Sequence, residues 1–184
     1  PINVVNVNSL GIAMLKLTRE TLVPILSKES YYYNQNPFQG VIVDVAKQWM
    51  PPAKRNEQTT VGLKLDEALS PNKRGALLLQ VARENVILRA DVQVTEMGLT
   101  AKYSPEDVLV WVTKLRDASP VANASVELRD DANNVRWQGT TDADGFAKAP
   151  GWGKLGLTAR DEWSRPRVWV IVSREDDIAY TSSD

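Results

Sequence analysis

The stretch Val126-Glu127-Leu128-Arg129-Asp130-Asp131-Ala132-Asn133-Asn134-Val135-Arg136-Trp137 decides the fold class of this chain. Val126 and Leu128 are apolar and alternate with charged residues, which is the period of a strand with one buried face. The Asp- and Asn-rich run that follows is typical of a tight turn, and a second run suited to a strand comes directly after it. The stretch therefore predicts a β-hairpin.

Short apolar runs of this kind recur along the whole chain at intervals of roughly 8–12 residues, which is typical of β-sandwiches. No long segment has the period of an amphipathic helix. A single helical turn is predicted at residues 20–26, where Pro24 limits its length. The first two runs are predicted to pair as an edge hairpin. The predicted strands lie at residues 2–7, 12–17, 41–49, 61–65, 77–81, 92–94, 99–103, 108–113, 126–129, 135–137, 146–147, 155–159 and 168–172.

The strand pattern restarts after residue 90, and each half holds enough strands for a two-layer core of its own. With 184 residues and a hydrophobic fraction of 43%, the chain has enough apolar surface for a core in each half. We therefore predict an all-β chain of two consecutive antiparallel β-sandwiches, at residues 1–90 and 91–184. Residues 85–94 are predicted to link them.

The charge balance excludes several kinds of partner. The 22 basic and 23 acidic side chains give a formal net charge of −1. They are spread along the chain, so neither a nucleic-acid site nor an anionic-membrane surface is predicted. No apolar run approaches the roughly 18 residues of a membrane-spanning helix. The chain begins at Pro1 without a Met or a signal peptide, which indicates a piece trimmed from a longer protein.

The chain contains no His and no Cys, which excludes His- or Cys-dependent catalytic and metal sites within it. Its glycines lie at turns such as Gly11, Gly40 and Gly145, so no phosphate-binding loop is predicted. Two carboxylates could still act as acid and base, although Asp at hairpin turns commonly bonds backbone amides. We predict no enzyme activity, no catalytic, cofactor-binding or metal-binding residue, no cofactor and no small-molecule substrate. The acidic residues weighed are Asp130, Asp131, Asp142, Asp144, Glu175, Asp176 and Asp177.

The run Asp142-Ala143-Asp144-Gly145 resembles part of a calcium-binding loop. Thr140 and Lys148 depart from the EF-hand pattern. A tight turn closed by Gly145 is therefore favoured, with calcium binding as the alternative.

Six Trp residues are many for a chain of this size. Trp111 and Trp169 lie within branched apolar strands, so we predict core or interdomain positions for them. Trp152 and Trp163 lie in loops and are the candidates for an interface. A rival hypothesis, immunoglobulin-like adhesion or carbohydrate-binding modules of an exported protein, requires such loop Trp side chains to form an exposed row.

Four motifs of the second half resemble bacterial α2-macroglobulin-like proteins in order and spacing. They are VTEMGLTAK (94–102), VLVWVT (108–113), PVANA (120–124) and GTTDADG (139–145). The first half is similar to the preceding domain of the same array, through the segments 12–19, 58–65 and 75–81. The resemblance implies macroglobulin domains, each a seven-stranded antiparallel sandwich of fibronectin-like form.

This resemblance also implies a function for the parent protein. Such proteins are large and periplasmic, in some cases anchored to the inner membrane, and inhibit invading proteases by entrapment after a bait region is cut. The thioester motif Cys-x-Glu-Gln is absent because the chain has no Cys, and no bait region is recognisable. The resemblance thus implies a structural scaffold, whose partners are neighbouring macroglobulin domains and, through the parent, exogenous proteases.

Overall fold

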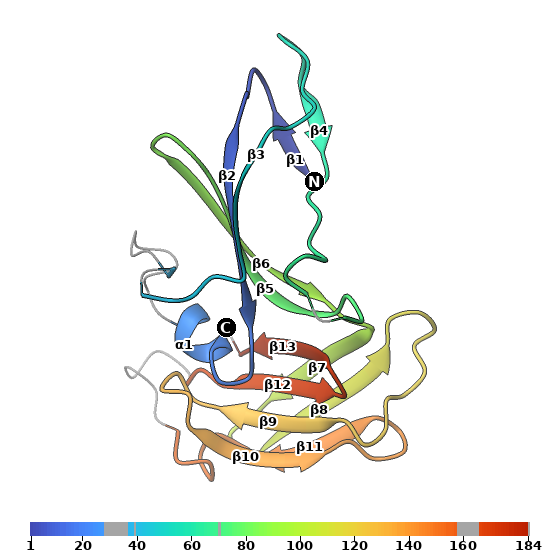
Figure 1. Ribbon diagram of the computed structural model, residues 1–184. Coiled ribbons are helices and arrows are strands. Elements are labelled where there is room, and N and C mark those ends of the chain that lie inside the picture. The colour runs from blue at the N-terminus through green and yellow to red at the C-terminus, as the bar shows by residue number, and fades with distance from the viewer. Residues whose placement is uncertain (28–36, 39, 70, 158–165, 184) are drawn as a thin grey trace. The chain divides into compact units, whose positions relative to one another are not determined.

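The computed structural model describes residues 1–27, 37–38, 40–69, 71–157 and 166–183 (Figure 1). These ranges contain strands, in antiparallel sheets, and one five-residue helix, so the all-β prediction is confirmed. None of the helical structure in them is long and apolar enough to cross a membrane. The elements are β1 (Ile2–Val4), β2 (Leu10–Leu17), α1 (Leu22–Leu26), β3 (Val45–Trp49), β4 (Thr59–Val61), β5 (Gly75–Arg83), β6 (Val86–Val94), β7 (Met97–Tyr103), β8 (Asp107–Lys114), β9 (Ser125–Arg129), β10 (Val135–Thr140), β11 (Phe146–Pro150), β12 (Trp169–Arg174) and β13 (Asp177–Ser182).

The chain divides into two compact units that interleave along the sequence. The first consists of Pro1–Leu17 and Pro37–Gln93, and the second of Thr18–Asn36 and Val94–Asp184. The predicted domains, 1–90 and 91–184, differ from this division, because they place the segment that carries α1 in the first domain instead of the second unit. The boundary between the units, after Gln93, lies within residues 85–94, where the link was predicted, and these residues also contain the whole of the long strand β6.

The first unit is built on a four-stranded sheet of order β3-β2-β5-β6, with β1 and β4 forming a separate two-stranded sheet. In the larger sheet β2 pairs with β3 on one side and with β5 on the other. The core contains buried side chains from both sheets, which are Val4, Leu10, Ile12, Met14, Val61, Ala68, Leu77 and Val81.

The predicted edge hairpin between residues 2–7 and 12–17 is wrong, because β1 pairs with β4 instead of β2. Polar contacts tie the two strands together. The Asn6 side-chain amide donates to Asn56 Oδ1 at 3.1 Å, and the Asn56 backbone amide donates to Asn6 Oδ1 at 2.7 Å. Thr60 Oγ1 donates to Asn3 Oδ1 at 2.7 Å. These bonds are long-range in sequence, so the local pattern could not indicate them.

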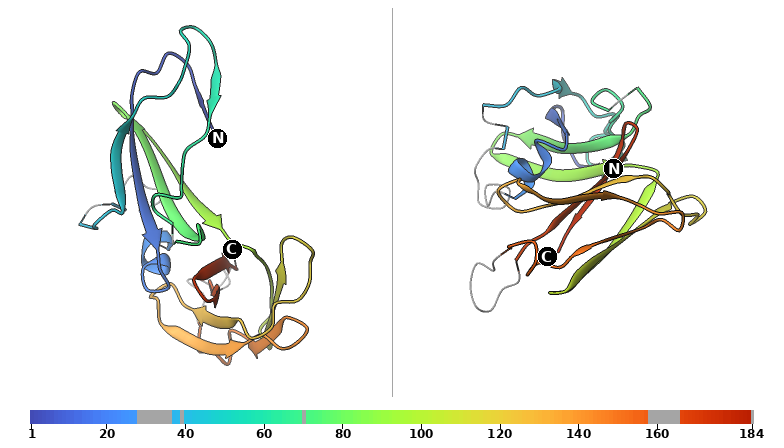
Figure 2. Two further views of the ribbon diagram at one scale, coloured as in Figure 1. Left: turned by 45° about the vertical axis from the view of Figure 1, so that its right-hand side comes forward. Right: turned by 90° about the horizontal axis from the view of Figure 1, so that it is seen from below.

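The second unit is a two-layer sandwich, with sheets of order β10-β9-β12-β13 and β11-β8-β7 (Figure 2). The predicted hairpin at residues 126–137 is confirmed as β9 and β10, which pair antiparallel with one irregularity between Val135 and Trp137. Residues 155–157, predicted as the start of a strand, lie in turns, while residues 158 and 159 fall outside the described ranges. The core between the layers contains Met97, Val108, Val110, Val112, Val121, Ala124, Val126, Leu128, Ala147, Ala149, Leu155, Val168, Val170, Val172 and Ala179.

Candidate functional site

Two charged side chains of β9 are buried on the face of the strand opposite to the core. Glu127 and Arg129 alternate with the core residues Val126 and Leu128, yet their side chains are only 12% and 9% exposed. A charge removed from water is costly unless it is paired and hydrogen-bonded. The contacts of these two side chains are therefore the first place to look for a site.

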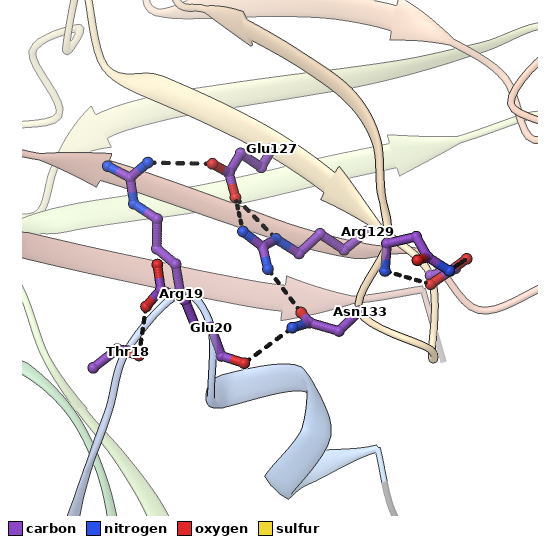
Figure 3. A network of polar contacts seen from close by, with 8 residues as sticks. Thr18, Arg19, Glu20, Glu127, Arg129 and Asn133 are labelled. Carbon is purple, nitrogen blue, oxygen red and sulfur yellow. Dashed lines mark hydrogen bonds and ion pairs between the residues drawn. The ribbon is translucent and has the colours of Figure 1, made fainter.

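Figure 3 shows how the two charges are satisfied. Arg129 donates to Glu127 Oε2 through Nε at 2.9 Å and through Nη2 at 2.6 Å, which is a two-point charge-assisted contact. Its Nη1 donates to Asn133 Oδ1 at 2.8 Å, and Arg19 Nη1 donates to Glu127 Oε1 at 3.2 Å. The Asn133 side-chain amide then donates to the backbone oxygen of Glu20 at 2.9 Å. We call these five residues the polar clamp.

The clamp holds the segment that enters the second unit at Thr18. Thr18 O accepts the Leu22 amide at 2.9 Å, while the Thr18 amide donates to Thr21 Oγ1 at 2.9 Å, so the turn before α1 is fixed locally. Thr18 Oγ1 also donates to the Glu20 carboxylate at 2.7 Å, and this hydrogen bond lowers the pKa of Glu20. At the end of α1, Ser27 Oγ donates to the backbone oxygen of Asp131 at 3.3 Å.

The β9–β10 turn next to the clamp is stabilised by Asp130. Its carboxylate accepts the Asn134 backbone amide at 2.8 Å and Arg136 Nε at 2.8 Å. Burial raises the pKa of Asp130, but the hydrogen bonds from Asn134 and the Arg136 guanidinium outweigh it, so the pKa is lowered. The neighbouring Asp131 accepts Trp169 Nε1 at 2.9 Å. These carboxylates hold backbone and side chains in place, which is a structural role.

The turn at Asp142 uses its carboxylate in the same structural way. Asp142 Oδ1 accepts the backbone amides of Asp144 at 3.0 Å and Phe146 at 2.8 Å. Gly145 has φ +81°, and a Cβ there would lie 2.4 Å from Val112 O, so only glycine fits. The predicted turn closed by Gly145 is confirmed. Within the described ranges, no three His, Cys, Asp or Glu side chains are grouped so as to hold a metal ion.

Two of the remaining acidic residues considered in the sequence lie at the turn between β12 and β13. Asp177 is 5% exposed, and its Oδ2 accepts the Glu96 backbone amide at 2.9 Å. Glu175 adopts φ +56° in the turn between β12 and β13. The acidic residues whose contacts are described above act as turn and backbone acceptors.

The Trp predictions have mixed outcomes. Trp169 is 5% exposed, as expected of a core position. Trp111 is not in the core, the first of the two positions predicted for it, because it is 42% exposed and stacks on Phe146 with ring centroids 5.6 Å apart. The interdomain position stays a prediction. Trp152 is half-buried, and Trp163 lies outside the described residues.

The first unit also contains a pocket of about 410 Å³ that sequence analysis missed. Met14, Trp49 and Leu63 contribute apolar walls, and an ion pair between Lys47 and Glu67 lies at its lining. Because neither charged group is buried and the pair neutralises itself, the pocket offers no strong catalytic or ionic site. Its residues come from separate strands, so no local motif could have revealed it.

The motifs that suggested a family in the sequence lie within the sandwich just described. The family model for the bacterial alpha-2-macroglobulin MG3 domain matches residues 94–184. Residues 94–184 belong to this macroglobulin-domain family. The resemblance found in the sequence is thereby confirmed, and the chain is a macroglobulin-domain fragment of this kind. No curated protein sequence matches the chain.

Solved structures of alpha-2-macroglobulins share the fold of this macroglobulin fragment. A crystal structure of native Escherichia coli alpha-2-macroglobulin spanning domains NIE-MG1 has a TM-score of 0.70 and 14% identity, covering 98% of this chain and 86% of that one. A second Escherichia coli structure, spanning domains MG0-NIE-MG1, has a TM-score of 0.68 and 13% identity. That match covers 99% of this chain and 57% of the Escherichia coli chain. The crystal structure of Salmonella alpha-2-macroglobulin reacted with methylamine has a TM-score of 0.60 and 14% identity. That match covers 97% of this chain and 10% of the Salmonella chain. The chain thus spans just over half of one relative and a tenth of another.

Proposed function

We propose that this chain is a structural scaffold within a large periplasmic alpha-2-macroglobulin that inhibits proteases by entrapment. The match of the MG3 domain model to residues 94–184 is the observation that carries this proposal. In this proposal the chain supplies two β-rich units of the parent, and inhibition belongs to the parent protein. Their neighbours are further macroglobulin domains of the same parent.

Several features support a scaffold without a reaction of its own. The sequence has neither His nor Cys, so a thioester and the common nucleophile–base pairs cannot come from it. The buried charges Glu127 and Arg129 of the polar clamp pair with each other and help to hold a segment of backbone within the second unit.

The test compares the full-length parent with residues 1–184 alone. Each is incubated with trypsin, and the remaining activity is measured on casein and on a small chromogenic peptide. Entrapment predicts that the parent protects casein while the small peptide is still cleaved, and that residues 1–184 protect neither. Equal loss of both activities, or inhibition by the isolated chain, would contradict the proposal. Osmotic-shock fractionation of cells that express the parent tests the periplasmic location.

The exposed Trp111, stacked on Phe146, favours carbohydrate binding as a second candidate function. Titration of residues 1–184 with a panel of oligosaccharides, followed by Trp fluorescence, tests it. A saturable change that is lost in Trp111→Ala would support a carbohydrate-binding module. An unchanged Trp fluorescence over the whole panel would contradict this second candidate.

A further inference from the structure

The pocket of the first unit is lined by the strand β3 and by the run of chain that begins at β4. The strand β3 contributes Lys47 and Trp49, and the run contributes residues 59–64. Trp49 lies opposite Leu10, a core residue of β2. Lys47 is two positions from Trp49, so both side chains stand on the core face of the sheet. The pocket therefore opens onto the same sheet face that carries the core of this unit.

The walls of the pocket are mainly apolar. Met14 is 0% exposed and Val61 is 5% exposed, while Trp49 and Leu63 are half-buried and pack against the core. Small-molecule sites commonly measure about 300–1,000 Å³ and have apolar walls with a few polar groups. A pocket of about 410 Å³ with these walls fits that description. The body of a matching ligand is therefore apolar, because it would leave water for these side chains.

The charged groups of the lining define the other end of such a ligand. The lining contains the ammonium groups of Lys47 and Lys64 and the carboxylate of Glu67, which leaves one positive charge in excess. Lys47 and Glu67 form an ion pair with each other. Lys64 is exposed and, in the part of the chain that the structure describes, forms neither a hydrogen bond nor an ion pair. The pocket thus offers one uncompensated cation beside apolar walls.

We propose that this pocket binds amphipathic carboxylic acids, with the apolar body against Met14 and Trp49 and the carboxylate next to Lys64. A neutral molecule with the same body keeps the apolar contacts but loses the charge contact. An amine with the same body is repelled by Lys64. Because Lys64 is exposed, its charge selects among ligands by a modest factor, and the apolar walls supply most of the affinity.

Three probes of equal chain length separate these contributions. They are octanoic acid, octan-1-ol and octylamine, each added to residues 1–184 at pH 7 and constant ionic strength. The readout is the Trp49 indole N–H signal in ¹H–¹⁵N NMR spectra, identified as the signal that Trp49→Phe lacks. We expect octanoic acid to shift it saturably, with a dissociation constant on the order of 0.1–1 mM. Octan-1-ol should bind about two- to fivefold more weakly, and octylamine more weakly still.

Two charge variants should act in opposite directions. Lys64→Gln is expected to weaken octanoic acid about two- to fivefold, to the level of octan-1-ol. Glu67→Gln leaves the Lys47 ammonium without its carboxylate, so octanoic acid should bind about two- to fivefold more tightly. Neither variant should change the binding of octan-1-ol. Arg55→Gln, at an exposed position outside the lining, is the matched control and should change nothing.

A variant of the apolar wall tests the other half of the proposal. Leu63→Gln places an amide in the wall and should weaken octanoic acid and octan-1-ol by the same factor. Thermal unfolding shows whether this half-buried position tolerates the change. The charge variants at Lys64 and Glu67 test the pocket independently of that result, because both side chains are exposed and the fold does not depend on them.

Three results would overturn the proposal. The first is the absence of a saturable shift of the Trp49 signal with octanoic acid up to about 3 mM, well above the expected dissociation constant. The second is equal affinity for the acid, the alcohol and the amine. The third is an affinity for octanoic acid that neither Lys64→Gln nor Glu67→Gln changes, which would place the carboxylate away from this lining.

Discussion

The two units treat an apolar strand face differently. In the second unit Val108, Val110 and Val112 are completely buried, because a second sheet of comparable width faces β8. In the first unit the same kind of face is buried on β5 but exposed on β6. The comparison teaches that alternation determines which side of a strand is apolar. The width of the facing sheet determines whether that side is buried.

Breaking the polar clamp should have the largest effect and be specific to the second unit. Glu127→Ala leaves the buried Arg129 guanidinium without its carboxylate, which is expected to cost about 3–5 kcal/mol of unfolding free energy. The matched variant in the first unit is Glu67→Ala, whose ion pair with Lys47 is partly exposed and should contribute no more than about 1 kcal/mol. Urea unfolding followed by Trp fluorescence compares the unfolding free energies of the two variants. A loss from Glu127→Ala no larger than the loss from Glu67→Ala would show that the clamp is not important for stability.

Truncating one Leu in each unit addresses the comparison directly. Leu128→Ala, at a completely buried position, is expected to cost about 2–5 kcal/mol. Leu88→Ala, at a position 60% exposed, should change the unfolding free energy by no more than about 0.5 kcal/mol. Thermal unfolding of both variants measures the difference. A large loss of stability in Leu88→Ala would mean that this side chain is covered after all.

A pair of glycine variants separates backbone conformation from steric contact in the second unit. Gly156→Ala, at φ +64° with nothing within 4 Å of the added Cβ, should cost about 1 kcal/mol. Gly145→Ala, at φ +81°, adds a clash with Val112 O and should cost about 2–3 kcal/mol. Chemical denaturation of the two variants gives the difference. Equal costs would indicate that the β11 turn relaxes freely.

The smallest expected effect concerns acid stability. Because hydrogen bonds lower the pKa of Asp130 in the folded chain, this group stabilises the fold at pH values above its unfolded pKa of about 3.9. The stability is lost as the pH falls below that value through the folded pKa. Asp130→Asn should therefore be less stable than the natural chain at pH 7, and the difference in unfolding free energy should narrow as the pH falls below about 4. A difference in unfolding free energy between the variant and the natural chain that does not change with pH would contradict the role given to Asp130.

The sequence predicted the local features of this fold well. The hairpin at residues 126–137, the turn closed by Gly145 and the helical turn around Pro24 depend on residues close together in the chain, and all three are present. The polar clamp was not predicted, because Arg19 and Glu127 are 108 positions apart. Nothing near either residue indicates its partner.

Trp111 shows a second limit of the pattern. In β8 both faces are largely apolar, with Leu109 and Trp111 on one side and Val108 and Val110 on the other. Such a run is typical of a strand buried on both faces, which is why a core or interdomain position was predicted for Trp111. Leu109 and Trp111 are exposed among the described residues, because the burial of a strand face depends on what packs against it in space and not on the local sequence.

The interleaving of the two units has a consequence for how such chains evolve. Since the chain passes between the units after Leu17, after Asn36 and after Gln93, no single recombination point separates one unit from the other. A crossover near residue 93 that brought residues 94–184 into another gene would leave behind Arg19 and the backbone oxygen of Glu20, and with them part of the shell around Glu127 and Arg129. The two units are therefore expected to have been inherited, duplicated and lost together.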